Sequence, residues 1–262
     1  MAIRQWKEIL VPYDQAVEEL KLKFKSIRKE YRKRNEYSPI EFITGRVKEI
    51  NSMLEKASKF QIPLERVEYE LEDIAGIRIM CQFVDDIWTV VKILRGRNDM
   101  QVIYEKDYVT NVKESGYRSY HMIIKYPVHM AEGTKEILAE IQIRTLAMNF
   151  WATIEHSLNY KYKRAIPEEI KRKLKEAADS AYNLDELMTG IKDEITDAQK
   201  LFEVKSSFVT EIVNNILTLS SLGKHNEAMR FREHLNKVLK DGDVVELSEL
   251  LAKTQRAIDM FK

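Results

Sequence analysis

The sequence predicts an α/β fold, in which a central sheet is flanked by helices and followed by a helical C-terminal part. Stretches that alternate apolar and polar side chains, typical of strands, recur between residues 72 and 145, and helix-favouring stretches lie on both sides of them. From Leu146 onward the pattern is helical. With 262 residues, 44% hydrophobic and 32% charged, the chain can form one domain with an appendage, or two small domains.

Composition limits the classes of function. The net charge of +1 argues against a protein that binds polyanions in bulk, so any attraction to phosphate must come from local clusters of cations. No apolar run approaches the roughly 18 residues of a membrane span, and the N-terminus lacks the features of a secretory signal. The single cysteine, Cys81, has no disulfide partner, which suits a reducing compartment. We therefore expect a soluble, cytoplasmic protein without a membrane partner.

The N-terminal segment 13–34 predicts an amphipathic helix. Its apolar stripe consists of Val17, Leu20, Phe24, Ile27 and Tyr31. One residue further on, a cationic stripe follows the same spacing and consists of Lys21, Lys25, Arg28 and Arg32. Such a row is usually a solvated flank, but beside a packed face it can also hold an anionic ligand or RNA. Pro39 ends this segment.

In the next segment, 42–60, we expect Gly45 to separate a short apolar start from a second helix. The apolar positions of this helix are Val47, Ile50, Leu54 and Ala57. Arg46 and Lys48 fall at the expected helix start, where positive charge opposes the macrodipole. A phosphate ligand would explain their placement.

Two expected strands each carry a row of polar side chains. In the first, 72–83, Ile77 and Cys81 face one side and Arg78 the other, with Asp73 at the start of the strand. In the second, 137–145, the polar face consists of Glu140, Gln142 and Arg144. A solvent-facing sheet surface is the common explanation of such a pattern. Because helices flank the strands, however, a polar face can also line a cleft.

Between these strands lie a short helix and a third strand. Asp85 and Asp86 precede the helical run, and short acidic side chains there accept free amide hydrogens, so we interpret them as capping residues and not as catalytic ones. After Gly96, the stretch MQVIYEKDYV predicts a strand that carries Lys106.

The stretch KESGYRSYH, residues 113–121, predicts a tight loop that leads into a further strand. Gly116 permits the turn and places Tyr117 at the mouth of the strand, near Lys113 and His121. One interpretation is a turn whose aromatic side chain caps the core. The other is a ligand site in which Tyr117 stacks on a nucleobase while the cations contact phosphates.

The remaining sequence predicts helices. A helix follows Leu146, and on it the adjacent Glu155 and His156 point in different directions and make a poor pair of metal ligands. Pro167 begins a helical stretch that continues to about Lys205. Three further helices are expected after it, with breaks at Gly223 and Gly242.

Two carboxylates and several cations point to phosphoryl chemistry. Asp73 and Glu140 suit a hard cation such as Mg²⁺, which accepts one or two protein carboxylates and completes its shell with water and substrate phosphates. The cations that can neutralise a triphosphate are Arg46, Lys48, Lys56, Arg78, Lys106 and Lys113. The chain has neither a GxxxxGK[ST] nor a GxGxxG motif, which argues against a P-loop enzyme and a dinucleotide binder.

The motifs ITGRVK, EDIAGIRI, KESGYRSYH and EIQIRTLAMNFWATIEH, in this order, resemble the synthetase domain of the RelA/SpoT family, and in particular its small alarmone synthetases of the RelQ type. The resemblance covers about residues 1–200. It implies a mixed central sheet of the nucleotidyltransferase-like kind in a synthetase domain 1–205, and it leaves a helical extension, 206–262, of unknown role. It also implies transfer of the β,γ-pyrophosphate of ATP to the 3′-hydroxyl of GDP or GTP, which gives AMP and (p)ppGpp.

The resemblance assigns roles to individual residues. Asp73 and Glu140 hold Mg²⁺, and Glu140 is also the general base. Tyr117 stacks on guanine, while Arg46 and Arg78 sandwich adenine. Phosphates are contacted on the ATP side by Lys48 and Lys56, and on the acceptor side by Lys106, Lys113 and His121. Gln142 makes a polar contact with the acceptor nucleotide.

The resemblance further implies a homotetramer with a cleft that binds (p)ppGpp as a regulator. The matching positions are Lys21, Lys25, Arg28, Phe42, Gly45 and Asn149. None of the five histidines is followed by aspartate, so the sequence lacks the HD pair of the family's hydrolases and we expect synthesis only. The alternative is a non-catalytic regulatory protein that binds single-stranded RNA through the cationic stripe.

Overall fold

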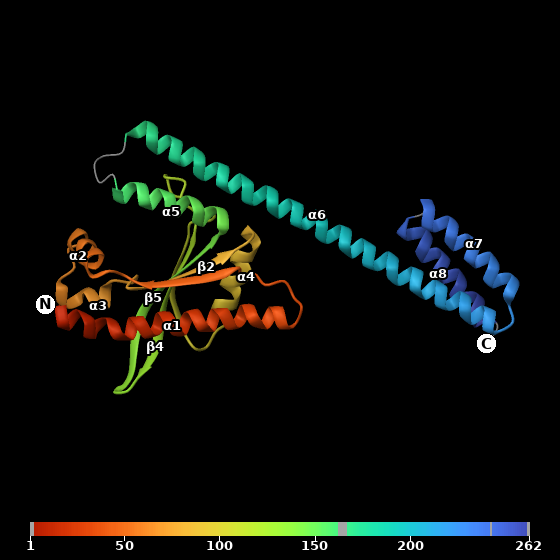
Figure 1. Ribbon diagram of the computed structural model, residues 1–262, viewed down its shortest axis with the longest axis horizontal. Helices are drawn as coiled ribbons and strands as arrows, with labels where there is room; N and C mark the ends of the chain where they lie inside the picture. Colours follow the sequence, from red (N-terminus) through yellow and green to blue (C-terminus); the bar gives the residue numbers. More distant parts are fainter. Residues whose placement is uncertain (1–2, 162–166, 242, 261–262) are drawn as a thin grey trace. The chain divides into compact units, whose positions relative to one another are not determined.

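The computed structural model describes residues 3–161, 167–241 and 243–260 (Figure 1). In chain order its elements are α1 (Ile3–Lys33), β1 (Phe42–Val47), α2 (Ile50–Lys59), the 3₁₀ helix Leu64–Arg66, α3 (Val67–Glu70), β2 (Ala75–Cys81), α4 (Val84–Arg95), β3 (Gln101–Asp107), β4 (Tyr120–Met130), β5 (Gly133–Thr145), α5 (Leu146–Lys161), α6 (Glu168–Ser221), α7 (His225–Asp241) and α8 (Val244–Asp259). The elements divide into two units, Met1–Thr189 and Gly190–Lys262.

The sheet of the first unit has the strand order β1-β2-β5-β4-β3. Strands β2 and β5 pair in parallel, whereas the other three pairs are antiparallel. The sheet is therefore mixed, with helices packed against it, which confirms the predicted fold class.

The apolar side of the sheet forms the main core. Ile77, Ile79 and Cys81 of β2 are fully buried in one cluster with the apolar stripe of α1 and the inner side of α4. Figure 1 shows α1 on one side of the sheet and α5 on the other. The alternation predicted for β2 is correct, and it leaves Arg78 on the side opposite the main core.

The first helix is longer than expected. It begins at Ile3 and includes Pro12, whereas the sequence predicted a start near Tyr13. The additional turns are held by burial, because Trp6 is only 5% exposed and Tyr13 1%. The predicted end of the helix is correct to one residue.

The segment around Gly45 was predicted wrongly. Phe42–Val47 is strand β1, antiparallel to β2, and α2 begins only at Ile50. Arg46 therefore lies in a strand, and neither Arg46 nor Lys48 lies in a helix. A Cβ at Gly45 would come within 2.9 Å of Val17 Cγ1 and 3.0 Å of Lys21 Cδ, so the glycine permits close packing of α1 and does not mark a break.

The capping role of the acidic pair at the start of α4 is confirmed for Asp86. Its Oδ2 accepts a hydrogen bond from the backbone amide of Phe83, the residue before the helix, at 3.1 Å. Asp86 lies in the first turn and is only 5% exposed. Its carboxylate is thus used locally by the fold.

Helix α6 is continuous over 54 residues, so the separate helix predicted after about Lys205 is wrong. Its start directly after Pro167 is as predicted, and Gly223 ends the segment with a φ of +79°, a conformation that glycine adopts without strain. The predicted break at Gly242 lies outside the described residues.

The second unit has its own core, made by the last part of α6 with α7 and α8. Ile212, Leu219 and Leu250 are fully buried in it. A partly buried polar contact joins α6 to α8, where Asn215 Nδ2 donates to Thr254 Oγ1 at 3.1 Å. Among the helices that the structure describes, none is long and apolar enough to cross a membrane.

The first part of α6 is attached to the sheet through Asp185. The Thr145 hydroxyl at the end of β5 donates to Asp185 Oδ2 at 2.5 Å and accepts from the amide of Met148 in α5 at 3.1 Å. Asp185 is only 5% exposed. The pKa of its carboxyl is raised to about 6 because burial outweighs the lowering effect of the hydrogen bond from Thr145, and the charge of Glu186 adds a smaller upward contribution. A raised pKa disfavours the ionised folded state, so this carboxylate destabilises the fold as pH rises from about 3.8 to about 6.

Replacing Asp185 by asparagine is expected to stabilise the protein at neutral pH. The amide oxygen still accepts from Thr145, and the variant avoids the ionisation cost, which is about 3 kcal/mol at pH 7.5 and about a third of that at pH 4.5. Thermal and urea unfolding of the two proteins at both pH values measures this difference. Asp197→Asn, at an exposed position of the same helix, is the control. A stability difference that does not change with pH would contradict the proposed cause.

Candidate functional site

The face of the sheet opposite the main core gathers polar side chains from all five strands. Neighbouring residues in one row across the sheet are Thr44, Arg78, Gln142, His121 and Lys106. The adjacent row includes Arg46, Gly76 and Glu140. The parallel β2–β5 pair thus brings together residues that are more than sixty positions apart in the sequence.

A cavity of about 370 Å³ opens over these rows. It is lined by Thr44, Gly45, Arg46, Lys48, Asp73, Gly76, Ile77, Arg78, Glu140 and Gln142. Gly76 lies in register between Arg46 and Glu140 and has no side chain to fill the space. Both predicted carboxylates and three of the four predicted ATP-binding residues therefore line one cavity.

Asp73 precedes β2 and is held by two lysines. Lys48 Nζ lies 2.7 Å from its Oδ2, and Lys56 Nζ from helix α2 lies 2.9 Å from its Oδ1. Burial raises the pKa of the Asp73 carboxyl, but the hydrogen bonds and charges of the two lysines outweigh burial and hold that pKa below its ordinary value. The side chain is therefore an anion at neutral pH, and its counter-charges are groups that also suit phosphate.

Glu140 lies in the middle of β5 with both carboxylate oxygens bound. Its Oε1 is 2.8 Å from His121 Nδ1, and its Oε2 accepts from Gln142 Nε2 at 2.7 Å. Burial and the nearby charge of Asp73 raise its pKa, whereas the contacts with His121 and Gln142 lower it more, so the net shift is downward. Glu140 is thus a deprotonated carboxylate in electrostatic contact with the second carboxylate of the cavity.

The loop before β4 has the predicted turn. Gly116 adopts a φ of +85°, and its amide donates to the carbonyl of Lys113 at 2.8 Å. A Cβ at this position would lie 2.6 Å from Cβ of Ala178 in α6, so both the turn and the packing require glycine. The loop carries Tyr117 to the mouth of β4, as the sequence predicted.

Tyr117 is half-buried, and its ring is surrounded by cations and aromatics. Lys113 Nζ lies 4.9 Å and the Arg144 guanidinium 5.2 Å from the ring centroid. The Trp151 ring lies 6.5 Å away. The Tyr117 hydroxyl contacts His121 Nε2 at 2.7 Å. Tyr117 is therefore joined to Glu140 through one histidine, and it is not simply an aromatic cap of the core.

The remaining predicted cations differ in their distance from the cavity. The guanidinium groups of Arg78 and Arg46 are close enough to interact: burial, Arg144 and Arg46, in that order, lower the pKa of Arg78. Lys106 lies at the far end of the polar row, with its ammonium 4.8 Å from the centroid of the Tyr104 ring, and it does not line the cavity.

The cavity offers few protein ligands to a divalent cation. Asp73 and Glu140 supply two carboxylates to one cavity, and in the residues that the structure describes no cluster of three or more His, Cys, Asp or Glu could hold a metal ion. This set fits a cation that keeps most of its ligands as water and substrate phosphate, and it does not fit a structural metal cage.

The predicted regulatory residues are only partly brought together. Gly45 packs on Lys21, and Arg28 pairs with Glu41, the residue before Phe42, at 3.1 Å. In the described part of the chain, no hydrogen bond or ion pair joins Lys25 or Asn149 to the others. Asn149 Oδ1 is buried without a hydrogen-bond partner in α5.

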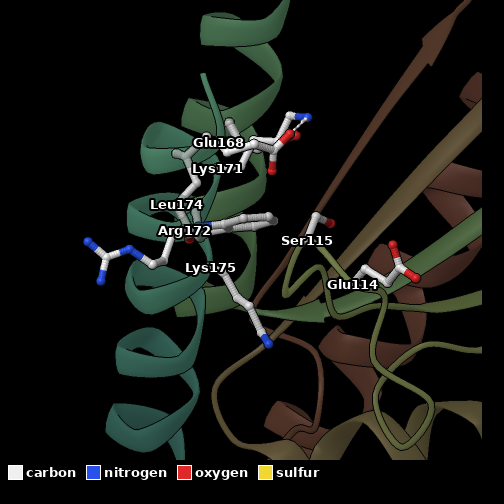
Figure 2. A pocket seen from close by; sticks show the side chains of 9 residues that line it. Glu114, Ser115, Glu168, Lys171, Arg172, Leu174 and Lys175 are labelled. Atoms are coloured by element: carbon white, nitrogen blue, oxygen red, sulfur yellow. Dashed lines mark hydrogen bonds and ion pairs between the residues drawn. The ribbon is translucent and has the colours of Figure 1, made fainter. Parts of the chain in front are cut away.

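A second cavity, of about 680 Å³, lies between the Tyr117 loop, α5 and the start of α6 (Figure 2). Its charged lining is partly paired internally, since Lys171 contacts Glu168 at 2.6 Å. Glu114 and Ser115, just before Gly116, are the loop residues that line it. This cavity borders the aromatic loop and does not include the carboxylate pair, and no pattern in the sequence predicts it.

The sequence pattern predicts no role for one residue of the site, Arg144. Arg144 was placed on the polar face with Glu140 and Gln142, but its contact with Tyr117 depends on how β4 pairs with β5. No spacing within either strand predicts that pairing. The alternation of β5 identified the correct face, and the register supplied the partner.

A carboxylate pair in a cation-lined cavity, beside an aromatic loop on a mixed sheet, is suited to an enzyme that transfers phosphoryl groups between nucleotides. A family model described as a region found in RelA/SpoT proteins matches residues 45–165. GTP pyrophosphokinase YjbM of Bacillus subtilis is 55% identical over 202 residues, which are 77% of this chain and 95% of the relative.

Two solved structures are similar over the same share of the chain. Small alarmone synthetase 1 from Bacillus subtilis bound to its product pppGpp superposes with a TM-score of 0.71 at 56% identity, over 73% of this chain and 98% of that one. The same synthetase bound to AMPCPP gives 0.65 at 52% identity, over 74% and 98%. The chain belongs to the RelA/SpoT family and is similar to its small alarmone synthetases. About a quarter of the chain has no counterpart in these proteins.

Proposed function

We propose that this protein is a GTP pyrophosphokinase that transfers the β,γ-pyrophosphate of ATP to the 3′-hydroxyl of GDP or GTP. The observation that supports this most strongly is the position of Glu140. It borders the cation-lined cavity and is linked through His121 to the ring of Tyr117. A carboxylate between a phosphate site and an aromatic platform can activate an acceptor hydroxyl for attack on a bound triphosphate.

The cavity over β1 and β2 is assigned to ATP. Arg46 and Arg78 provide two guanidinium groups from adjacent strands, which suits stacking on adenine. Lys48 and Lys56 are paired with Asp73 in this structure and can transfer their hydrogen bonds to phosphate oxygens. Gln142, which also lines this cavity, makes a polar contact with the acceptor nucleotide.

The acceptor nucleotide is assigned to the Tyr117 side of Glu140. Guanine stacks on the Tyr117 ring, and Lys106, Lys113 and His121 contact phosphates. The loop that carries Tyr117 also borders the 680 Å³ cavity, into which the acceptor can extend. This arrangement places the two nucleotides on opposite sides of one carboxylate.

The transfer forms one bond and breaks one bond at the β-phosphorus of ATP. Glu140 accepts the proton of the acceptor's 3′-hydroxyl, and the 3′-oxygen forms a bond to the β-phosphorus of ATP. The bond between the β-phosphorus and the oxygen that bridges to the α-phosphorus breaks, and AMP leaves with the electron pair. Arg46, Lys48, Lys56 and Arg78 stabilise the charge on the transferred group.

A divalent cation, which we propose to be Mg²⁺, would be held by Asp73 and Glu140 and would neutralise phosphate charge when bound. The side chains themselves orient the two substrates. Since no His-Asp pair occurs in the sequence, we propose synthesis without hydrolysis.

Assembly and regulation follow the same family resemblance. We propose a homotetramer that binds (p)ppGpp at Lys21, Lys25, Arg28, Phe42, Gly45 and Asn149. The proximity of Gly45 to Lys21 supports part of this site. A reduced, buried Cys81 supports a cytoplasmic location. For residues 1–205 we propose the synthetase domain, and for 206–262 a helical extension.

Binding of single-stranded RNA is the alternative function of the cationic stripe. Two of its members are already paired with carboxylates, Lys21 with Glu18 and Arg28 with Glu41, which reduces its positive potential. RNA affinity that falls steeply with salt and survives loss of Asp73 and Glu140 would favour this function.

The direct test is an activity assay of the purified protein. With ATP, GDP or GTP, and Mg²⁺, we expect AMP and a 3′-pyrophosphorylated guanosine nucleotide in equal amounts, separated by ion-exchange chromatography. Controls without acceptor and with ADP as acceptor measure ATP hydrolysis and base selectivity. A folded protein that releases no such product under these conditions would refute the proposed function.

A further inference from the structure

Arg144 lies beside the proposed acceptor site and donates hydrogen bonds to two of its residues, Tyr117 and Gln142. We propose that Arg144 is a positioning residue, whose buried guanidinium fixes both the Tyr117 ring, on which guanine stacks, and the carboxylate of Glu140, which accepts the proton. This inference rests on the function proposed above. It adds a residue that couples binding of the acceptor base to placement of the general base.

Five side chains form a closed ring of hydrogen bonds. Arg144 Nη2 donates to Tyr117 Oη at 2.7 Å and to Gln142 Oε1 at 2.5 Å. Tyr117 Oη lies 2.7 Å from His121 Nε2, and His121 Nδ1 lies 2.8 Å from Glu140 Oε1. Gln142 Nε2 closes the ring by donating to Glu140 Oε2 at 2.7 Å. Both carboxylate oxygens of Glu140 are therefore held by chains that begin at one guanidinium nitrogen.

The hydrogen bonds of the ring have a consistent direction. Since the guanidinium can only donate, Tyr117 Oη accepts from it and keeps its own proton for His121 Nε2. The imidazole then carries its proton on Nδ1 and donates it to Glu140, an assignment that follows from the network. On the other arm, Gln142 accepts at Oε1 and donates at Nε2. Each bond thus polarises the next toward the carboxylate, which strengthens the chain.

Arg144 is an unusual group for a structural role. It is only 4% exposed, and in the described part of the chain no ion pair joins it to a carboxylate. Its acceptors are neutral, the third being Ser119 Oγ, to which its Nε donates at 3.2 Å. A buried charge without a countercharge is unfavourable for stability, so its presence beside Tyr117 is better explained by what it positions.

The ring connects Tyr117, the proposed stacking platform for guanine, to Glu140, the proposed general base, although the two side chains are not hydrogen-bonded to each other. Residues 140, 142 and 144 share one face of β5, and the pairing of β4 with β5 places His121 opposite Gln142. A displacement of the Tyr117 phenol opens the ring and leaves His121, which holds one oxygen of Glu140, without its partner at Nε2. Contacts that hold the Tyr117 ring, including a stacked guanine, therefore also hold the base in place.

The test separates effects on the two substrates. Arg144→Gln is expected to reduce kcat/KM for GDP about 100-fold, through both kcat and KM, while KM for ATP stays within about twofold. Arg144→Lys keeps the charge but lacks the planar guanidinium with its several fixed N–H donors. We therefore expect it to recover less than about a tenth of the lost kcat/KM. A wild-type value for the lysine variant would show that charge alone is needed and would overturn the inference.

Tyr117→Phe tests the coupling with a minimal change. It retains the stacking ring but removes the oxygen at which the guanidinium and the imidazole meet. We expect kcat to fall about tenfold, whereas the Kd for GDP, measured by calorimetry without ATP or divalent cation, stays within about twofold of wild type. Unchanged kcat would show that the ring does not position the base.

Arg95→Gln is the matched control, because Arg95 also donates to a tyrosine hydroxyl at 3.0 Å. That tyrosine, Tyr120, is the first residue of β4, next to His121. We expect wild-type kinetics for this variant, and thermal melting verifies that all variants are folded at the assay temperature. Equal losses in the two glutamine variants, or equal changes in KM for ATP and GDP, would overturn the inference. Failure of the wild-type protein to make product would refute the proposed function instead.

Discussion

Glu140→Gln is expected to lower kcat about 1000-fold, the range in which loss of a general base falls. Glutamine has the same size, and its amide oxygen can still accept from His121 or Gln142, so the polar face of β5 should keep its shape. It cannot take up the proton of the acceptor hydroxyl. We therefore expect Kd for ATP and for GDP, each measured separately without divalent cation, to stay within about threefold of wild type.

Glu105→Gln is the control for this substitution. Glu105 is also a partly buried carboxylate, on β3, and it pairs with Arg95 at 2.5 Å and accepts from Tyr120. Its pKa is lowered chiefly by Arg95, so it resembles Glu140 electrostatically without lining the cavity. Turnover of Glu140→Gln at the wild-type rate would refute the assignment of the base.

The polar face of the site was predicted from alternation alone. Because side chains of a strand alternate between its two faces, Glu140, Gln142 and Arg144 had to share one side, and Arg78 had to oppose Ile77. Gly116 similarly predicted the turn before Tyr117, since few other residues adopt a positive φ without strain. These are local rules, and the structure confirms them at these positions.

The parts that were missed depend on contacts between distant segments. The strand Phe42–Val47 contains a glycine and an arginine, which favour strands weakly, and it forms because it pairs with β2 and is covered by α1. The contact of Arg144 with Tyr117 exists only because β4 pairs with β5 in one register. Register is a property of two strands, and neither sequence alone specifies it.

In helix α6 the sequence predicted a break that does not exist. A change in composition near Lys205 suggested a break, yet α6 passes through it, and even Gly190 is accommodated within the helix. Glycine in a helix interior costs only about 1 kcal/mol, which neighbouring turns can offset. Helix ends are set by capping and by residues such as Gly223, and composition is a weaker guide.

Asp73→Asn is expected to lower kcat about 100-fold or more, because it removes one of the two carboxylates assigned to the divalent cation. Its effect on ATP binding should depend on the cation. The substitution also frees Lys48 and Lys56 from their ion pairs with the carboxylate, so both ammonium groups become available to phosphate. Without added metal, we expect the variant to bind ATP at least as tightly as wild type.

Asp99→Asn is the matched control for charge and packing. Asp99 is likewise held by two cations, Lys23 at 2.7 Å and Arg97 at 2.6 Å, but it lies outside the cavity. Calorimetry of ATP binding at increasing Mg²⁺ separates the two roles of Asp73. We expect Mg²⁺ to tighten ATP binding to wild type and to Asp99→Asn, and to have little effect on Asp73→Asn. Equal tightening in all three proteins would mean that Asp73 does not hold the cation, since its charge would then act only on the two lysines.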